Sequence, residues 1–397
     1  MRFSILIPTR NRLEYLRYAV ETVRRQDFSD WEMIVCDNCS EDNVADYVRL
    51  LDDPRIIYYR TAQPMPVTAN WNKAMEMCHG DYMIMLGDDD CLMRGYLREM
   101  NGLIDRFESP DVIHTNAFLY AYPGAVATSP AGFLQKWRYG IFNVHEPYVL
   151  EKKVASDLVE ETLNFRVGFG WNMQFSLVSR KMIELMKEFG DFFQSPYPDY
   201  YATNMLFLLG ERILIVPKPS VAIGITPKSF GGYYFSGKEM EGAAFLQNVG
   251  TKECPDAHES IFPGEEHTNN WYRAVLAITK NLRQSQPQLR VNVHRFRIVQ
   301  TIWLLRRSLM KKTPSILSVM GLLFGRISPR EVAYLCYLIV RIFVMRLMRI
   351  PRNVIDASLI GISKQYPSGT IEMVPTKRRY ENILDVFDNE PALASPQ

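Results

Sequence analysis

The chain has 397 residues, 47% of them hydrophobic and 23% charged, and a formal net charge of +2. This balance excludes wholesale disorder and a polytopic membrane protein, and the length favours two or three structural units over a single small binding module. Six cysteines are too few for a disulfide scaffold, which indicates a reducing cytoplasm as the setting.

The N-terminal region alternates short apolar runs with stretches of helical apolar spacing. Residues 3–7 are apolar and end at Pro8, before a signal-peptide core could form, so we expect no export by that route. Such alternation is typical of an α/β fold with a parallel sheet and right-handed crossovers. Strands are predicted at residues 3–7, 32–36, 56–59 and 82–86, and helices at residues 13–23, 44–51 and 69–77.

A second group of elements follows with less regular spacing. Pro196-Tyr197-Pro198-Asp199 predicts the start of a helix that runs through Leu209, because the prolines restrict the approach and Asp199 suits a helix N-terminus. Further strands are predicted at residues 112–120, 173–178, 212–216 and 221–225, and further helices at residues 181–189 and 271–282.

Polar residues follow three of the predicted strands. Thr9-Arg10-Asn11 follows the first, Asp37-Asn38 the second and Asp88-Asp89-Asp90 the fourth. Ligands of an open parallel sheet bind beyond the carboxyl ends of its strands, so we expect these residues to meet in one crevice.

The three consecutive aspartates need electrostatic compensation. Two carboxylates about 4 Å apart repel by about 4 kcal/mol at an effective dielectric constant near 20. A divalent cation or raised pKa values would relieve that repulsion, and oxygen ligands select Mg²⁺ or Mn²⁺. A solvated acidic turn or a helix cap is the alternative explanation for these residues taken alone.

Five short motifs follow one another along the N-terminal region. They are residues 5–12 (Ile-Leu-Ile-Pro-Thr-Arg-Asn-Arg), 35–42 (Val-Cys-Asp-Asn-Cys-Ser-Glu-Asp), 72–74 (Asn-Lys-Ala), 80–86 (Gly-Asp-Tyr-Met-Ile-Met-Leu) and 88–90 (Asp-Asp-Asp). Taken together and in this order, they resemble the inverting glycosyltransferases of family two, which have the GT-A fold. One departure from the family pattern is Gly87, where the family often has an acidic residue.

The resemblance implies a role for each motif residue. Thr9 and Asp37 are expected to contact the nucleotide, Asp88 to lie near the ribose, and Asp89 to bind a metal that bridges the diphosphate, with Asp90 in support. The implied cofactor is Mn²⁺ or Mg²⁺. Nucleotide-sugar binding is thus assigned to Pro8, Thr9, Arg10, Asp37, Asn72 and Asp88, and metal binding to Asp89 and Asp90.

A transferase of this kind also needs a base for the acceptor hydroxyl. Asp199 resembles the family's base by position, about 110 residues beyond the metal site, at a loop-to-helix junction. The usual acidic pair is replaced there by Pro198-Asp199. An ordinary helix N-cap is the alternative role for Asp199, and Asp191 is the nearest rival as the base.

The C-terminal region is strongly basic. Residues 290–352 contain thirteen Arg or Lys and one acidic residue, Glu331. Residues 332–347 are too short for a membrane span and contain Arg341 and Arg346, so the pattern indicates a basic amphipathic helix on an anionic membrane surface. A helical hairpin packed on the catalytic domain, or a dimer interface, is the alternative.

The domain prediction follows from these patterns. A GT-A catalytic domain is expected at residues 1–225, a loop-rich connection at 226–289, a basic helical region at 290–352 and an irregular tail at 353–397.

The sequence therefore predicts a metal-dependent, inverting transferase that moves a single sugar from a nucleotide-diphosphate sugar to a glycan or lipid-linked acceptor in cell-surface polysaccharide synthesis. We expect it in the cytoplasm, on the inner face of the membrane, without a nucleic-acid partner. A catalytically silent nucleotide-sugar-binding subunit is the main alternative. A dinucleotide oxidoreductase is disfavoured because no Gly-x-Gly-x-x-Gly follows the first strand.

Overall fold

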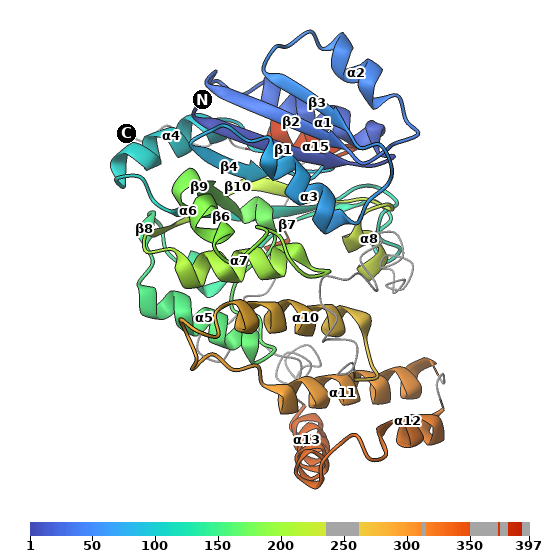
Figure 1. Cartoon of the computed structure of the whole chain (residues 1–397). Coiled ribbons are helices and arrows are strands. Elements are labelled where there is room, and N and C mark those ends of the chain that lie inside the picture. The colour runs from blue at the N-terminus through green and yellow to red at the C-terminus, as the bar shows by residue number, and fades with distance from the viewer. Residues whose placement is uncertain (236–261, 312–314, 350–371, 374–379, 391–397) are drawn as a thin grey trace.

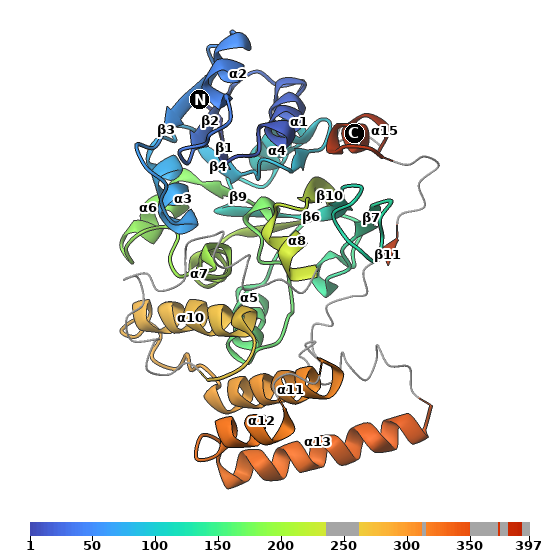
Figure 2. The same ribbon diagram turned by 90° about the vertical axis from the view of Figure 1, so that its right-hand side faces the viewer.

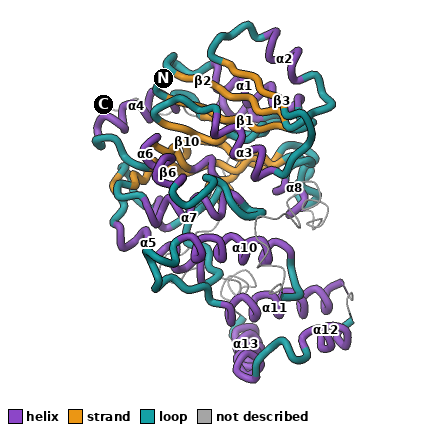
Figure 3. Tube along the Cα trace, in the orientation of Figure 1, coloured by secondary structure: helices purple, strands orange, loops and turns teal. Residues whose placement is uncertain are grey.

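The computed structural model describes residues 1–235, 262–311, 315–349, 372–373 and 380–390 (Figure 1). The described strands lie together in one mixed sheet, and the described residues between 262 and 349 form helices and their connections (Figure 3). The strands are β1 (Phe3–Thr9), β2 (Trp31–Asp37), β3 (Ile56–Arg60), β4 (Tyr82–Met85), β5 (Cys91–Leu92), β6 (Val112–Ala121), β7 (Phe133–Lys136), β8 (Tyr148–Val149), β9 (Ser176–Ser179), β10 (Ile213–Ile225) and β11 (Glu372–Met373).

Helices cover both faces of this sheet and build the rest of the described chain. Figure 2 shows α1, α4 and α15 on one side of the sheet and α3, α6 and α7 on the other. The helices are α1 (Leu13–Arg24), α2 (Val44–Leu50), α3 (Val67–Glu76), α4 (Tyr96–Arg106), α5 (Lys152–Leu163), α6 (Arg180–Lys187), α7 (Pro198–Leu209), α8 (Phe230–Phe235), α10 (Glu266–Asn281), α11 (Val293–Lys311), α12 (Ile316–Leu323), α13 (Pro329–Leu347) and α15 (Ile383–Asn389).

The parallel sheet predicted from the N-terminal alternation is present in β1 to β4. β1 pairs in parallel with β2 and β4, and β2 pairs in parallel with β3. β1 and β2 are buried along nearly their whole length, which explains their continuous apolar runs. The register pairs Thr9 with Asp37, and so sets the polar ends of the two strands side by side.

The second half of the sheet, for which the sequence predicted strands but no pairing direction, is largely antiparallel. β9 lies between β4 and β6 and is antiparallel to both, and β7 is antiparallel to β6. The two strands predicted at residues 212–216 and 221–225 are one strand, β10, which has register shifts between Val216 and Val221 and pairs in parallel with β6. Antiparallel strands need no crossover helix, as the helix-free connection between β6 and β7 shows, so strict alternation of strand and helix is not required there.

The sequence indicated an irregular C-terminal tail, but the structure has a helix, α15, within it. α15 packs against α1 and β5 and buries Ile383, Val386 and Phe387. Arg94 donates to the carbonyl oxygens of Phe387 and Asp388. The last described helix therefore lies back on the sheet and forms part of its helical cover.

Helices α11, α12 and α13 lie together at the end of the molecule farthest from α2 (Figures 1 and 2). Leu335 and Leu338 of α13 pack against Ile298 of α11. Glu331 is buried at the start of α13, where it closes a capping box with Ser328 and pairs with His294 at 2.8 Å. Within the described residues, no helix is long and apolar enough to cross a membrane.

Candidate active site

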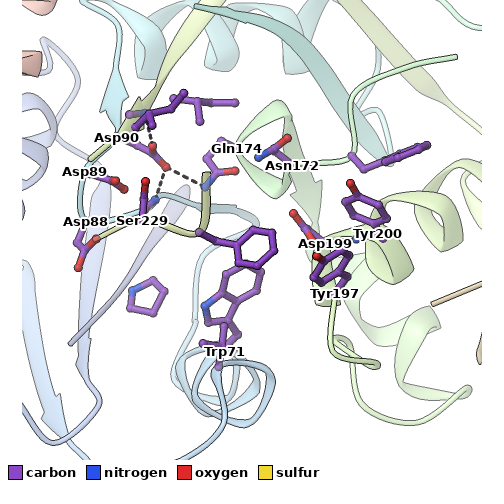
Figure 4. A pocket seen from close by; sticks show the side chains of 18 of the residues that line it. Trp71, Asp88, Asp89, Asp90, Asn172, Gln174, Tyr197, Asp199, Tyr200 and Ser229 are labelled. Atoms are coloured by element: carbon purple, nitrogen blue, oxygen red, sulfur yellow. Dashed lines mark hydrogen bonds between the residues drawn. The ribbon is translucent and has the colours of Figure 1, made fainter. Parts of the chain in front are cut away.

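A cavity of about 560 Å³ opens at the carboxyl ends of β1 and β4. Figure 4 shows Asp88, Asp89 and Asp90 on one side of it and Tyr197, Asp199 and Tyr200 across from them. We call the two sides the charged end and the aromatic end. The charged end comprises Thr9, Arg10, Arg12, Asp88 and Asp89, and the aromatic end comprises Trp171, Tyr197, Tyr200, Phe230 and Trp271.

Strand register brings the charged end together. The backbone of Leu86 donates to the carbonyl of Leu6, which extends the pairing of β4 with β1 up to the aspartates. The hydroxyl of Thr9 donates to Asp88 Oδ2 at 2.7 Å. Pro8 and Arg10 also line the cavity, so three neighbouring residues of the predicted nucleotide-sugar set, with Asp88, share one wall.

Arg12, which the sequence analysis left out of the site, lies between two of the aspartates. Its guanidinium pairs with Asp88 Oδ1 at 2.8 Å and with Asp89 Oδ2, and it donates to the hydroxyl of Thr226 at 2.9 Å. Burial lowers the pKa of Arg12, but the charges of Asp88 and Asp89 outweigh that effect and raise it. Burial raises the pKa of Asp88 to about 6, against the opposing charge of Arg12. The acidic cluster is thus partly neutralised by the protein itself.

The carboxylate of Asp90 accepts hydrogen bonds from three neighbouring residues of the protein. Its Oδ1 accepts from the backbone of Gly224 at 2.8 Å, and its Oδ2 accepts from the backbone of Gly87 at 2.7 Å and from the amide of Gln174 at 2.8 Å. Burial, followed by the charge of Asp89, raises the pKa of Asp90 to about 7. Because both oxygens are used by protein donors, we no longer assign Asp90 as a metal ligand.

The same contacts explain why glycine stands at position 87. A side chain on Gly87 would collide with the carboxylate of Asp90. Glycine at this position therefore lets the carboxylate of Asp90 approach the backbone.

Two other residues that the sequence assigned to nucleotide-sugar binding form hydrogen bonds within the protein. Asp37 accepts from the backbone of Ser40 at 2.9 Å and from the hydroxyl of Tyr58 at 2.7 Å. Asn72 exchanges two hydrogen bonds with the backbone of Phe193, at 2.8 and 2.9 Å. Neither Asp37 nor Asn72 is among the described residues that line the cavity, whereas Asn38 and Trp71 are. The contact of Asp37 and Asn72 with a nucleotide sugar therefore stays a prediction.

Asp199 lines the cavity at its aromatic end. It lies in the first turn of α7, whose N-cap is Tyr197, so the alternative role as the N-cap is excluded. Burial raises the pKa of Asp199 to about 7, although its carboxylate accepts the backbone N–H of Tyr200 at 3.0 Å. Asp191, the rival base, is exposed to solvent and lies outside the cavity as the described residues outline it.

The aromatic end is a continuous set of ring contacts. Trp171 packs on Tyr200 and Trp271 with ring centroids 4.5 and 4.8 Å apart, and Tyr197 packs on Tyr200 and Phe230 at 5.0 and 5.3 Å. The ring nitrogens of His267 lie 3.2 and 3.4 Å from the hydroxyls of Tyr197 and Tyr200, and burial lowers the pKa of His267 to about 4. A neutral imidazole therefore completes this end.

The arrangement fits one metal ligand better than a complete metal cage. Among the described residues, no group of three or more His, Cys, Asp or Glu could hold a metal ion. Mg²⁺ is commonly held by one or two carboxylates together with the phosphates of a substrate. Asp89 satisfies that requirement, since only its Oδ2 contacts described protein donors, Arg12 and Thr226.

Comparison with known proteins finds similarity over the N-terminal part of the chain. The family model "Glycosyl transferase family 2" matches residues 4–130. The colanic acid biosynthesis glycosyl transferase WcaA of Escherichia coli is 39% identical over 89 residues, or 22% of this chain and 32% of that protein. A GalNAc(5)-diNAcBac-PP-undecaprenol beta-1,3-glucosyltransferase of Campylobacter jejuni is 34% identical over 99 residues, or 24% of this chain and 32% of that protein.

These matches are local. The chain aligns with about a third of the length of each of these two curated relatives. Among solved structures, residues 1–349 of S. aureus TarS in complex with UDP-GlcNAc superimpose with a TM-score of 0.46 and 15% identity, over 78% of this chain and 88% of that one.

Proposed function

Since residues 4–130 form a glycosyl transferase family 2 domain, we propose that this chain is a metal-dependent, inverting glycosyltransferase. It moves one sugar from a nucleotide-diphosphate sugar to a hydroxyl of a glycan or lipid-linked acceptor, in cell-surface polysaccharide synthesis. The observation that carries the proposal is a single cavity that has charged groups suited to a sugar diphosphate at one end and a carboxylate of raised pKa among aromatic rings at the other.

The charged end binds the donor in this proposal. Arg10 and Arg12 supply positive charge near the diphosphate, and Asp88 lies near the ribose. Asp89 would hold the divalent cation, Mn²⁺ or Mg²⁺, and the cation when bound stabilises the negative charge of the departing diphosphate. Asp90 holds the aspartate loop against β10 and Gln174.

Asp199 is the proposed base. An acceptor hydroxyl attacks the anomeric carbon on the face opposite the diphosphate and must lose its proton as the new bond forms. The proton passes to the carboxylate of Asp199, and the nucleoside diphosphate leaves with the electron pair of the broken bond. A pKa of about 7 makes Asp199 a stronger base than an ordinary aspartate while leaving it largely ionised above neutral pH.

The aromatic end suits an acceptor sugar. Sugar rings present C–H groups on their faces and hydroxyls at their edges, and aromatic side chains can cover the former while N–H groups bond the latter. Trp171 is 5% exposed, and its indole N–H meets no acceptor in the part of the chain that the structure describes. The Campylobacter relative, by its name, acts on an undecaprenol-linked glycan, which supports a lipid-linked acceptor as one form of this substrate.

We also propose that α12 and α13 bind an anionic membrane surface. Leu317, Phe343 and Leu347 are 81%, 62% and 68% exposed, and Arg326, Arg330, Arg346 and Arg349 are exposed on the same two helices or beside them. The acidic residue Glu331 is buried and paired. Apolar and basic side chains on one helical surface suit the interface of an anionic bilayer. Arg352, at the end of the predicted basic region 290–352, lies outside the described residues.

The membrane proposal is tested by sedimentation with vesicles. Wild-type protein is expected to sediment with phosphatidylglycerol vesicles and less with phosphatidylcholine vesicles, and the double variant Phe343→Ser, Leu347→Ser to remain in solution. Concentration-dependent dimerisation that this variant abolishes, without vesicle binding, would identify the surface as a contact between two copies instead.

The enzymatic proposal is tested with a panel of UDP-, GDP- and dTDP-sugars in Mn²⁺, Mg²⁺ or chelator, with membrane extract as the acceptor source. We expect one donor to be consumed only with metal, and Asp89→Ala and Asp199→Ala to abolish that turnover. Binding of a donor without turnover under every condition would favour the catalytically silent binding subunit.

A further inference from the structure

We propose that Arg12 is the resident cation of the Asp88–Asp89 pair and yields Asp89 to a divalent cation only when a diphosphate is bound to accept the guanidinium. Metal and donor then bind together rather than independently. The inference rests on the proposed function, and it assigns a regulatory part to a residue of the same site.

The contacts of Arg12 are those of a bridging counter-ion. One guanidinium nitrogen pairs with Asp88 at 2.8 Å, and the other pairs with Asp89 and donates to Thr226. The side chain of Arg12 is 12% exposed and those of Asp88 and Asp89 are 3% and 8% exposed. Charges in such a poorly hydrated place interact strongly, so the pair holds Arg12 firmly.

The backbone near Arg12 is fixed, so any movement must come from its side chain. Asn11 has a left-handed backbone with φ of 55°, and its side chain accepts the backbone N–H of Glu41 at 2.7 Å. The backbone of Asn11 donates to the hydroxyl of Ser40 at 2.9 Å. These contacts anchor the turn between β1 and α1 to the loop after β2, while the long side chain of Arg12 can change rotamer within the cavity.

A guanidinium and a divalent cation cannot share Asp89 without strong repulsion. Arg12 already pairs with Asp89 Oδ2, and because the two oxygens of one carboxylate lie close together, a cation on Oδ1 would be next to the guanidinium. A second cation at Asp89 therefore requires the guanidinium to withdraw. Leaving the buried pair without a new anionic partner is costly for an arginine, which makes metal binding weak when no other anion is present.

A bound diphosphate provides that partner. The other carboxylates that line the cavity are Asp90, whose oxygens are used by backbone and amide donors, and Asp199, which lies at the aromatic end. A diphosphate at the charged end offers several oxygens that match the planar donors of arginine. The withdrawn guanidinium would bond these oxygens, so diphosphate and metal raise each other's affinity by the same factor.

The test measures Mn²⁺ binding by electron paramagnetic resonance, with and without pyrophosphate, UDP, GDP or dTDP. For the wild type we expect weak Mn²⁺ binding alone. For Arg12→Gln we expect Mn²⁺ alone to bind at least about tenfold more tightly, with a correspondingly smaller gain from pyrophosphate. Arg10→Gln is the matched control for Mn²⁺ alone, because Arg10 lines the same wall but forms no ion pair with the described aspartates. Without pyrophosphate it should keep the wild-type Mn²⁺ affinity.

A second variant keeps the test decisive if Arg12→Gln does not fold. Lysine offers a single point charge, so Arg12→Lys should fall between the wild type and the glutamine variant in Mn²⁺ affinity. Unchanged or weaker Mn²⁺ binding in both Arg12 variants, or equal effects in Arg10→Gln, would overturn the inference. If transfer occurs with metal in the wild type but these affinities do not change, the proposed function stands and only the role of Arg12 fails. If no form binds Mn²⁺ even with pyrophosphate, the metal-dependent function itself fails.

Discussion

The two ends of the cavity are built in different ways. The charged end comes mainly from two strand ends, at residues 8–12 and 88–90, which the register of β1 and β4 sets side by side. The aromatic end gathers Trp171, Tyr197 and Tyr200, Phe230, and Trp271 from four separate segments, the last three being α7 with its N-cap, α8 and α10. One end is specified by neighbours on a sheet and the other by the packing of distant helices.

The chemistry of the two ends differs as clearly as their construction. Ion pairs and short hydrogen bonds hold the charged end, whereas ring contacts and a neutral His267 surround the base at the aromatic end. A site that separates charge on the donor from proton removal on the acceptor needs this contrast, because the low polarity around Asp199 is what raises its pKa.

The largest expected effect is at Asp199. Asp199→Asn should lower transfer by about 10²–10⁴-fold, because the amide cannot accept the proton of the acceptor, while donor binding at the other end stays as in the wild type. Isothermal titration with the donor and a transfer assay separate the two readouts. Asp191→Asn is the matched control and should retain full transfer. Loss of donor binding in Asp199→Asn would mean that the two ends are not independent.

A smaller but still large loss is expected at the charged end. Asp89→Asn should lower transfer by about a hundredfold or more, because the residue proposed to hold the cation loses its charge. In contrast with Asp199→Asn, it should also weaken donor binding in the presence of Mn²⁺. Equal donor affinity with and without Mn²⁺ in the wild type would remove the proposed role of Asp89.

The pH dependence of transfer should follow the ionisation of Asp199 at the aromatic end. The folded protein holds the pKa of Asp199 at about 7, raised from 3.8, so the proton-accepting form is lost as pH falls through 7. At saturating donor, transfer should decline about tenfold for each unit below that value and level off above it. The same shift means that the buried carboxylate costs stability above neutral pH, and Asp199→Asn should melt at a higher temperature than the wild type at pH 8 but not at pH 4. A flat pH profile between 5.5 and 8 would exclude Asp199 as the base.

A substitution of Trp171 tests whether the aromatic end binds the acceptor. Trp171→Phe keeps a ring but removes the indole N–H, and the loss of one hydrogen bond predicts a rise of about fivefold in the KM for acceptor, with no change for the donor. Initial rates at varied acceptor and at varied donor distinguish these outcomes. A change confined to the donor KM would place the donor, rather than the acceptor, against this ring.

The smallest effect is expected for Asp90, whose hydrogen bonds hold the aspartate loop in place. Asp90→Asn leaves an N–H group facing the backbone donors of Gly87 or Gly224, so we expect a loss of about 1–3 kcal/mol in unfolding free energy and a melting temperature lower by a few degrees. Mn²⁺ affinity measured at a temperature where the variant is fully folded should change little. A large loss of Mn²⁺ affinity would return Asp90 to the metal ligands.

Sequence alone determined the N-terminal sheet and most of the charged end. Apolar runs at helical and strand spacing are local signals, and polar residues directly after buried strands must emerge at the same edge of a parallel sheet. Thr9, Asp88 and Asp89 were therefore identified correctly as lining residues. Asp199 was found through the family resemblance, by its position about 110 residues beyond the aspartates at a predicted loop-to-helix junction.

Only the tertiary structure decided which side chains point into the cavity. Asp37 and Asn72 lie on the predicted elements but are used by Tyr58 and by the backbone of Phe193, and Arg12 turns toward two aspartates more than seventy-five residues away. The aromatic end and the docking of α15 depend likewise on contacts between distant segments. Periodicity reports which face of an element is buried, whereas the partner that a buried polar or aromatic group meets is set by how the elements pack.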